Sequence, residues 1–296
     1  MDIYTEQDKN IRKTWFLMTG FFVFVILIGW GFSYIYQSPG ILLFAVVFSV
    51  FMNILSYWNS DKIVLALYRA KEVTDTSHPD LFNITENIAI TAGLPMPRLY
   101  VIPETQPNAF ATGRNPEHGV IAVTQGLLDR LEKIELEGVI AHEMAHIGNR
   151  DTLLQTVVVV LIGFIALLSD LFIRMNIFGG RGSRDNKGGG VLIIVGIVLA
   201  ILSPIVATII QLAISRKREF LADSTGALFT RYPEGLASAL EKISSAHIPM
   251  QKANNATAHL FISNPFADKS KKGLSRLFMT HPPVEERVAR LRGVKS

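Results

Sequence analysis

The chain has 296 residues, of which 49% are hydrophobic, and a mean hydropathy of +0.31; it is too apolar for an ordinary soluble protein and long enough for one globular domain plus several membrane spans. Its formal charge of +4 is spread along the chain without a long basic block, so we expect no binding to nucleic acid. There is no cysteine, which excludes disulfides, thiolate ligands and cysteine nucleophiles, so any metal must be held by His, Asp or Glu.

The first apolar segment predicts a helical hairpin in the membrane. Residues 14–60 contain no charged residue, and the turn sequence Gln-Ser-Pro-Gly at 37–40 divides them into spans at about 14–36 and 40–58. Each span has about 20 residues, which is enough to cross roughly 30 Å of hydrocarbon. We therefore expect residues 1–60 to form an amino-terminal segment followed by a transmembrane hairpin.

Residues 61–151 predict the first part of a soluble domain. Apolar residues at helical spacing cover 79–92, and residues 127–149 read as one or two further helices. Between them lie three short β-rich runs, separated by Pro, Gly and Asn, which predict a small antiparallel meander. These runs are 98–102, 108–113 and 119–124.

Residues 152–214 predict a second transmembrane hairpin, with spans at about 152–173 and 191–214 joined by the Gly-rich, charged sequence FGGRGSRDNKGGG. The alternative, two buried helices of a soluble domain, is disfavoured by uncharged lengths of about 18 and 24 residues. Two hairpins return the chain to one face of the membrane. Residues 61–151 and 215–296 can thus form one split α+β domain, and the excess of Lys and Arg near the span ends on that face favours a cytoplasmic location.

The sequence Gly-Val-Ile-Ala-His-Glu-Met-Ala-His at 138–146 predicts a metal site. Four residues apart on a helix, His142 and His146 project from the same face, where two imidazoles can bind one Zn²⁺. Glu143 lies beside that face, so it need not bind metal and can take a proton from a water molecule that the metal activates.

The third ligand has to come from elsewhere in the chain. No histidine follows His146 in the register that metzincins use, and charged residues flank the motif, unlike the buried motif of an intramembrane protease. In the remaining class a later helix supplies a glutamate. The sequence Arg-Lys-Arg-Glu-Phe-Leu-Ala-Asp at 216–223 offers Glu219, and Asp223, four residues on, would accept the other ring N–H of a zinc-bound histidine. His146 and Glu219 both lie a few residues outside a predicted span, which places them at similar heights above one membrane face.

Four motifs occur in order along the chain: Ala-His-Glu-Met-Ala-His and Glu-Phe-Leu-Ala-Asp on either side of the second predicted hairpin, preceded by Pro-Asn-Ala-Phe-Ala-Thr-Gly at 107–113 and followed by Thr-His-Pro-Pro-Val-Glu-Glu-Arg at 280–287. With these motifs the chain resembles the HtpX-type membrane zinc metalloproteases, relatives of the CAAX prenyl proteases. The resemblance covers nearly the whole chain. It implies a gluzincin-like domain with one zinc per chain held by His142, His146 and Glu219, with Glu143 as catalytic base. It also implies that Asn108, Ala109 and Phe110 belong to an edge strand that pairs with an extended substrate, and that His281 and Arg287 help to stabilise the oxyanion.

The function implied by the resemblance is proteolytic quality control in the bacterial plasma membrane. We expect a multi-pass, zinc-dependent endopeptidase with its catalytic domain in the cytoplasm, acting on misfolded or damaged membrane proteins and unfolded polypeptides. One alternative is a CAAX-type processing protease acting on prenylated tails, although four spans form no obvious large chamber. A non-catalytic, zinc-stabilised membrane scaffold is the other alternative. A scaffold would not need the catalytic glutamate of the motif, whereas Glu143 is present.

Overall fold

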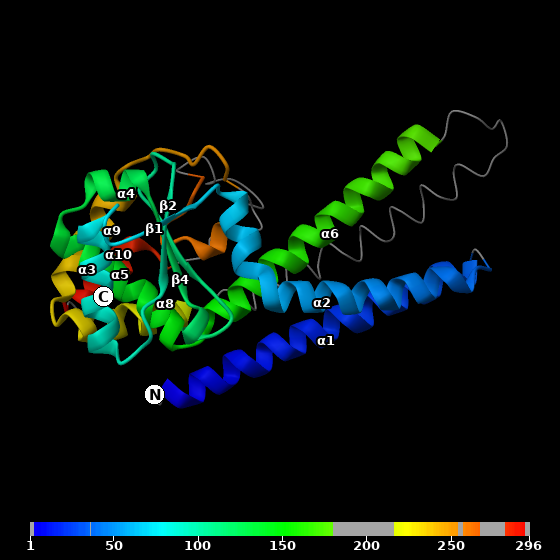
Figure 1. Cartoon of the computed structure of the whole chain (residues 1–296), viewed down its shortest axis with the longest axis horizontal. Helices are drawn as coiled ribbons and strands as arrows, with labels where there is room; N and C mark the ends of the chain where they lie inside the picture. The colour runs from blue at the N-terminus through cyan, green and yellow to red at the C-terminus, as the bar shows by residue number, and fades with distance from the viewer. Residues whose placement is uncertain (1–2, 36, 180–215, 254–256, 267–281, 294–296) are drawn as a thin grey trace.

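The structure is a computed structural model that describes residues 3–35, 37–179, 216–253, 257–266 and 282–293. Two long helices, α1 (Ile3–Ile35) and α2 (Pro39–Leu67), lie side by side and project from a soluble domain, and α6 (Asp151–Gly179) leaves the same domain at an angle to them (Figure 1). The turn between α1 and α2 is followed by Pro39, a residue suited to the first turn of a helix. This pair is the predicted first hairpin.

The projecting helices have the surface of membrane spans. In the described residues α1 over Gln7–Gly31 and all of α2 are long and apolar enough to cross a membrane. Aromatic and aliphatic side chains that include Phe16, Leu43 and Phe44 point outward, whereas Met18, Phe21 and Val157 pack in the cluster that joins α1, α2 and α6. The third predicted span falls on α6, which among the described helices qualifies as a candidate span only when it is taken together with α5 across the bend between them. The fourth, 191–214, lies outside the described residues.

A four-stranded sheet forms the centre of the soluble domain, and its topology differs from the predicted antiparallel meander. The strand order is β1-β2-β4-β3. β4 is antiparallel to β3 but parallel to β2, so the sheet is mixed. The chain between β2 and β3 does not form a hairpin; it carries β3 to the far side of the position that β4 then fills. The strands are β1 (Lys71–Val73), β2 (Arg98–Ile102), β3 (Ala109–Thr112) and β4 (Val120–Thr124).

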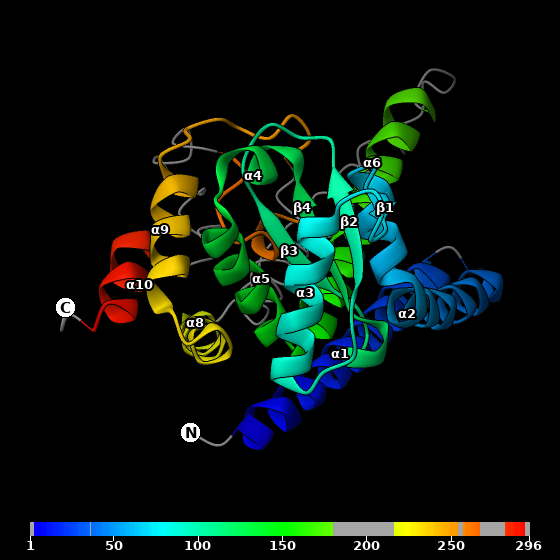
Figure 2. The same ribbon diagram turned by 60° about the vertical axis from the view of Figure 1, so that its left-hand side comes forward.

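Helices cover the sheet and surround α5 (Lys133–Gly148), which is buried on almost all sides (Figure 2). Two glycines allow its neighbours to approach closely: a Cβ at Gly138 would lie 2.5 Å from the backbone nitrogen of Leu236, and a Cβ at Gly226 would lie 2.9 Å from that of His142. Backbone packing at these distances fixes α5 against α8 and α9. The helices are α3 (Pro79–Ala92), α4 (Gln125–Arg130), α8 (Arg216–Thr230), α9 (Pro233–Ser244) and α10 (Val284–Leu291), with short 3-10 turns at Pro116–His118 and Ala258–Leu260.

A sharp bend separates α5 from α6. The two helices meet at 83°, and Arg150 in the turn has φ +57°, which lies in the left-handed region. The bend turns the chain from the interior of the soluble domain into the third apolar helix. It places Asp151, the first residue of α6, below the carboxyl-terminal end of α5.

Candidate metal centre

The predicted metal ligands come together. His142 and His146 lie on α5, Glu219 lies on α8, and within the described residues these three form a group whose ligand atoms all lie within 4.8 Å of one another. Nε2 of His142 is 3.2 Å from Nε2 of His146, and the carboxylate oxygens of Glu219 are 3.9 Å and 3.6 Å from these two nitrogens. Tetrahedral ligands bound at 2.0–2.1 Å lie about 3.3 Å apart, so the spacing fits a single ion.

The outer ring nitrogens of both histidines face carboxylates. Nδ1 of His142 is 3.0 Å from Oδ1 of Asp223, and Nδ1 of His146 is 2.9 Å from Oδ2 of Asp151. Because a carboxylate accepts hydrogen bonds, each Nδ1 carries a proton, which leaves Nε2 as the ring nitrogen that can bind a metal ion at the centre of the group. The two Nε2 atoms and the Glu219 carboxylate thus converge on one place, which is the arrangement that a metal ion requires. The donor set therefore fits a metal ion.

Asp151 is a site residue that the sequence reasoning missed. It follows His146 by five residues, a spacing that would not share a face on a straight helix. The bend after α5 brings it back beneath the imidazole, where it is fully buried. A signal could have been found in the Asn-Arg-Asp sequence at 149–151, because a polar, turn-forming run between a metal motif and an apolar span marks the point where the chain changes direction.

Burial and neighbouring charges shift the pKa values of the site. Burial, reinforced by the cation of Arg287, lowers the pKa of His142 to about 4. Burial would also lower the pKa of His146, but its hydrogen bond to Asp151 and the negative charge of Glu219 outweigh it and raise the value to about 9. Burial raises the pKa of Glu143 to about 7, in the range where a carboxylate is an effective general base at neutral pH.

Arg287 of α10 holds the carboxylate of Asp223 beside His142. It is 1% exposed and donates two hydrogen bonds to Asp223, from Nε at 2.9 Å and from Nη2 at 2.6 Å. Burial alone would raise the pKa of Asp223, but the charge of Arg287 and these hydrogen bonds hold it at about 2. Nη2 also lies 3.5 Å from the ring nitrogens of His142. The other residue expected beside it, His281, lies outside the described residues.

The strand expected to meet substrate, β3, lies at the edge of the sheet as the structure describes it. Successive residues of β3 point their backbone N–H and C=O groups to opposite sides. The carbonyl of Asn108 accepts from the N–H of Thr124 at the end of β4, so the backbone groups of Phe110 also point to β4, whereas those of Ala109 and Ala111 point away from the sheet. The Phe110 side chain is buried against Tyr68 and Phe261. Asn108 and Ala109 thus present polar groups at the outer edge, and Phe110 belongs to the core.

A segment of the chain's own backbone runs along this edge. The N–H of Ile262 donates to the carbonyl of Ala109 at 2.9 Å, and the Asn108 amide bonds both the N–H of Ser263, at 3.1 Å, and its carbonyl, at 2.9 Å. Since Ile262 lies opposite Ala109 and Ser263 next to Asn108, the segment runs antiparallel to β3. The carbonyl of Ile262 accepts from Nη1 of Arg287 at 3.4 Å. Groups expected to bind substrate are therefore engaged by residues 262 and 263.

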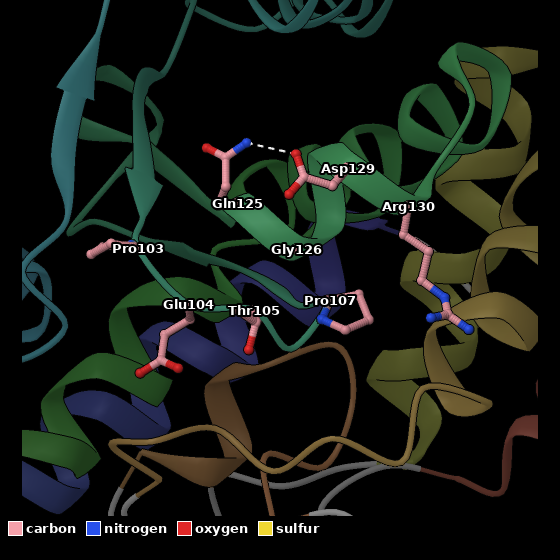
Figure 3. Close-up of a pocket in the computed structure, with 8 residues that line it drawn as sticks. All are labelled: Pro103, Glu104, Thr105, Pro107, Gln125, Gly126, Asp129 and Arg130. Carbon is pink, nitrogen blue, oxygen red and sulfur yellow. Dashed lines mark hydrogen bonds between the residues drawn. The ribbon is translucent and has the colours of Figure 1, made fainter.

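A separate surface pocket of about 530 Å³ lies between the loop before β3 and the start of α4 (Figure 3). In it Gln125 donates to Asp129 at 2.8 Å. None of its lining residues is a ligand of the metal centre, so the pocket does not change the location of the site. The lining residues are Pro103, Glu104, Thr105, Pro107, Gln125, Gly126, Asp129 and Arg130.

Comparison with known proteins agrees with this centre. Residues 75–295 match the family model described as peptidase family M48. The chain is 45% identical over 298 residues to a protease HtpX homolog of Thermoanaerobacter pseudethanolicus, covering 99% of this chain and 98% of the relative. It is 50% identical over 269 residues to a protease HtpX homolog of Pyrococcus furiosus, covering 89% and 90%.

A solved structure shares the fold. The crystal structure of S. mikatae Ste24p matches 97% of this chain and 67% of its own, with a TM-score of 0.52 and 18% sequence identity. The family match spans both segments of the soluble domain, including the helix with His142 and His146 and the helix with Glu219. The chain belongs to peptidase family M48.

Proposed function

We propose that the chain is a zinc-dependent endopeptidase of the bacterial plasma membrane, with one zinc per chain and its catalytic domain in the cytoplasm. The observation that carries the proposal is the convergence of two Nε2 atoms and one carboxylate, buried beside Glu143. Three nitrogen and oxygen ligands leave a fourth tetrahedral position open, as in catalytic zinc sites; structural sites use four protein ligands. Zinc suits such a ligand set better than the harder Mg²⁺ or Ca²⁺.

The residues of the site have distinct roles in peptide hydrolysis. When bound, zinc supplies Lewis acidity, which acidifies water and polarises a carbonyl. Glu143 takes a proton from the attacking water and delivers it to the leaving amine. His142, His146 and Glu219 hold the ion, while Asp223 holds His142 in the tautomer that presents Nε2. Arg287 places a fixed positive charge beside the centre, where it stabilises negative charge that develops on the scissile carbonyl.

The substrate is proposed to bind as an extended strand along β3. Its N–H would pair with the carbonyl of Ala109, and the Asn108 amide would bond its backbone as it now bonds residue 263. Only an unfolded or extended segment can add to a sheet edge, so folded soluble proteins are expected to be poor substrates. Loops and tails of misfolded or damaged membrane proteins meet this requirement and lie near a site that is attached to membrane helices.

A comparison of wild type with Glu143→Gln, both purified in detergent, tests the proposal. With casein as the unfolded substrate and the zinc content measured in each sample, wild type should cleave and the variant should lose about 100-fold or more of the rate while keeping one zinc per chain. Cleavage at the wild-type rate by Glu143→Gln would exclude its role as base. Absence of cleavage by zinc-loaded wild type would favour a specialised processing substrate or the scaffold alternative.

A further inference from the structure

A side chain of the first membrane helix reaches the metal centre. α1 extends beyond the hairpin and passes along the soluble domain near α8 in both views (Figures 1 and 2). There Asn10 is only 1% exposed, although it lies before the uncharged run of the helix, which begins at Thr14. Its Nδ2 donates to Oδ1 of Asp151 at 2.6 Å and also lies 3.2 Å from the carbonyl of Asn149. A buried amide in such contact with a carboxylate needs an explanation beyond membrane anchoring.

The orientation of the Asn10 amide is fixed by chemistry. On its other side, Nη1 of Arg218 donates to Oδ1 of Asn10 at 3.1 Å. A carboxylate only accepts and a guanidinium only donates, so the amide cannot be reversed without losing both contacts. Asn10 therefore joins three elements at one point: α1, the start of α6 with Asp151, and α8, on which Arg218 precedes the ligand Glu219.

The bond to Asp151 connects Asn10 with a metal ligand. The two oxygens of Asp151 have different partners: Oδ1 receives the Asn10 amide, and Oδ2 lies 2.9 Å from Nδ1 of His146. Nε of Arg218 forms an ion pair with Oδ1 at 3.7 Å, which is longer than a hydrogen bond, and Nη1 of the same guanidinium donates to Asn10. Without Asn10, Arg218 would be able to shorten this ion pair to a hydrogen bond and draw the carboxylate away from His146. The amide keeps the carboxylate in the rotamer that orients the imidazole.

We propose that Asn10 is a positioning residue for the metal centre: acting through Asp151, it fixes the tautomer and ring orientation of His146. The first membrane helix is thus part of the outer shell of the site as well as an anchor. This inference rests on the proposed zinc site. Gln7, one turn before Asn10 on α1, provides a matched comparison. Its Nε2 donates to the carbonyl of Gly148 at 2.7 Å, so it also holds α1 against the soluble domain, but through a group other than Asp151.

The test measures zinc affinity by competition with a chelator, using the full chain in detergent. Loss of a partner that orients a metal-binding histidine typically lowers affinity 10- to 100-fold. We expect Asn10→Ala to weaken zinc binding about tenfold and to alter the visible absorption spectrum of the Co²⁺-substituted protein, which reports ligand geometry. Gln7→Ala should remain within about twofold of wild type in affinity and keep the wild-type spectrum.

A double-mutant cycle separates positioning from general loss of stability. If Asn10 acts through Asp151, adding Asn10→Ala to Asp151→Ala should not weaken zinc binding further, whereas independent effects would multiply. Asn10→Leu, which keeps the branched shape of the side chain without a donor, serves as the second variant if Asn10→Ala does not fold. Wild-type affinity and spectrum in Asn10→Ala or Asn10→Leu, or multiplying effects in the cycle, would overturn the inference. Failure of wild type itself to bind zinc would instead refute the proposed function.

Discussion

Gly226→Ala tests whether close helix packing sets the metal geometry. The added Cβ would lie 2.9 Å from the backbone nitrogen of His142 and 3.1 Å from its Cα, so neither contact can be relieved by rotating a side chain. Reaching an ordinary contact of about 3.4 Å requires α8 to move away from α5 by about 0.5 Å. Metal–ligand distances vary by only about 0.2 Å, and Glu219 lies two turns earlier on the helix that has to move.

The effects on stability and on zinc binding should differ. Overpacking costs about 1–3 kcal/mol, but alanine favours a helix over glycine by about 1 kcal/mol, so the free energy of unfolding should fall by about 2 kcal/mol at most. Zinc affinity should fall about tenfold or more, measured by chelator competition. Gly163→Ala is the matched control, because a Cβ there meets no atom within 4 Å. Unchanged zinc affinity in Gly226→Ala would refute the reasoning that backbone contact between the helices positions Glu219.

Three further predictions concern other contacts of the domain. Arg287→Ala leaves the Asp223 carboxylate buried without its bidentate partner, which should lower the free energy of unfolding by about 3–5 kcal/mol in denaturant titrations, and an unchanged midpoint would contradict this. Ile262→Pro removes the N–H that occupies the Ala109 carbonyl, so kcat/KM for unfolded casein should rise about threefold; no change would mean that the segment does not compete with substrate. Burial would raise the pKa of Glu135, but the hydrogen bonds from Lys242 and Ser238 on α9 outweigh burial and lower it. These contacts therefore contribute their full stability above the unfolded pKa of about 4.3, and this stability is lost as the pH falls through the lower pKa of the folded state. Glu135→Gln should therefore lower the melting temperature at pH 7, and this deficit should shrink as the pH is lowered to about 3. A deficit of equal size at both pH values would argue against the assignment.

The sequence predicted those features that depend on local spacing. Two histidines four apart on a helix must share a face, and an uncharged run interrupted by Pro and Gly must either cross a membrane or be buried. The structure confirms that α5 brings His142 and His146 together and that Glu219 joins them, while the comparisons confirm the family. The division of the chain into domains and the role of Glu143 remain predictions.

The features that spacing did not predict depend on non-local geometry. The order of the strands was wrong because a loop of Pro and polar residues is equally compatible with a hairpin and with a passage to another position in the sheet. Asp151 was missed because its contact depends on an 83° bend. The segment at 262 and 263 carries no motif, since it binds the edge of β3 through backbone groups that every sequence possesses.

The distribution of the site along the chain has a consequence for biosynthesis. His142 and His146 leave the ribosome well before Glu219, which is separated from them by the apolar segments, and Arg287 follows later still. A nascent chain that has exposed only the His-Glu-x-x-His helix has two of the three predicted metal ligands. It still lacks both residues that contact His142, which are Asp223 and Arg287. The predicted metal site can therefore be complete only after the apolar segments and α8 have been synthesised.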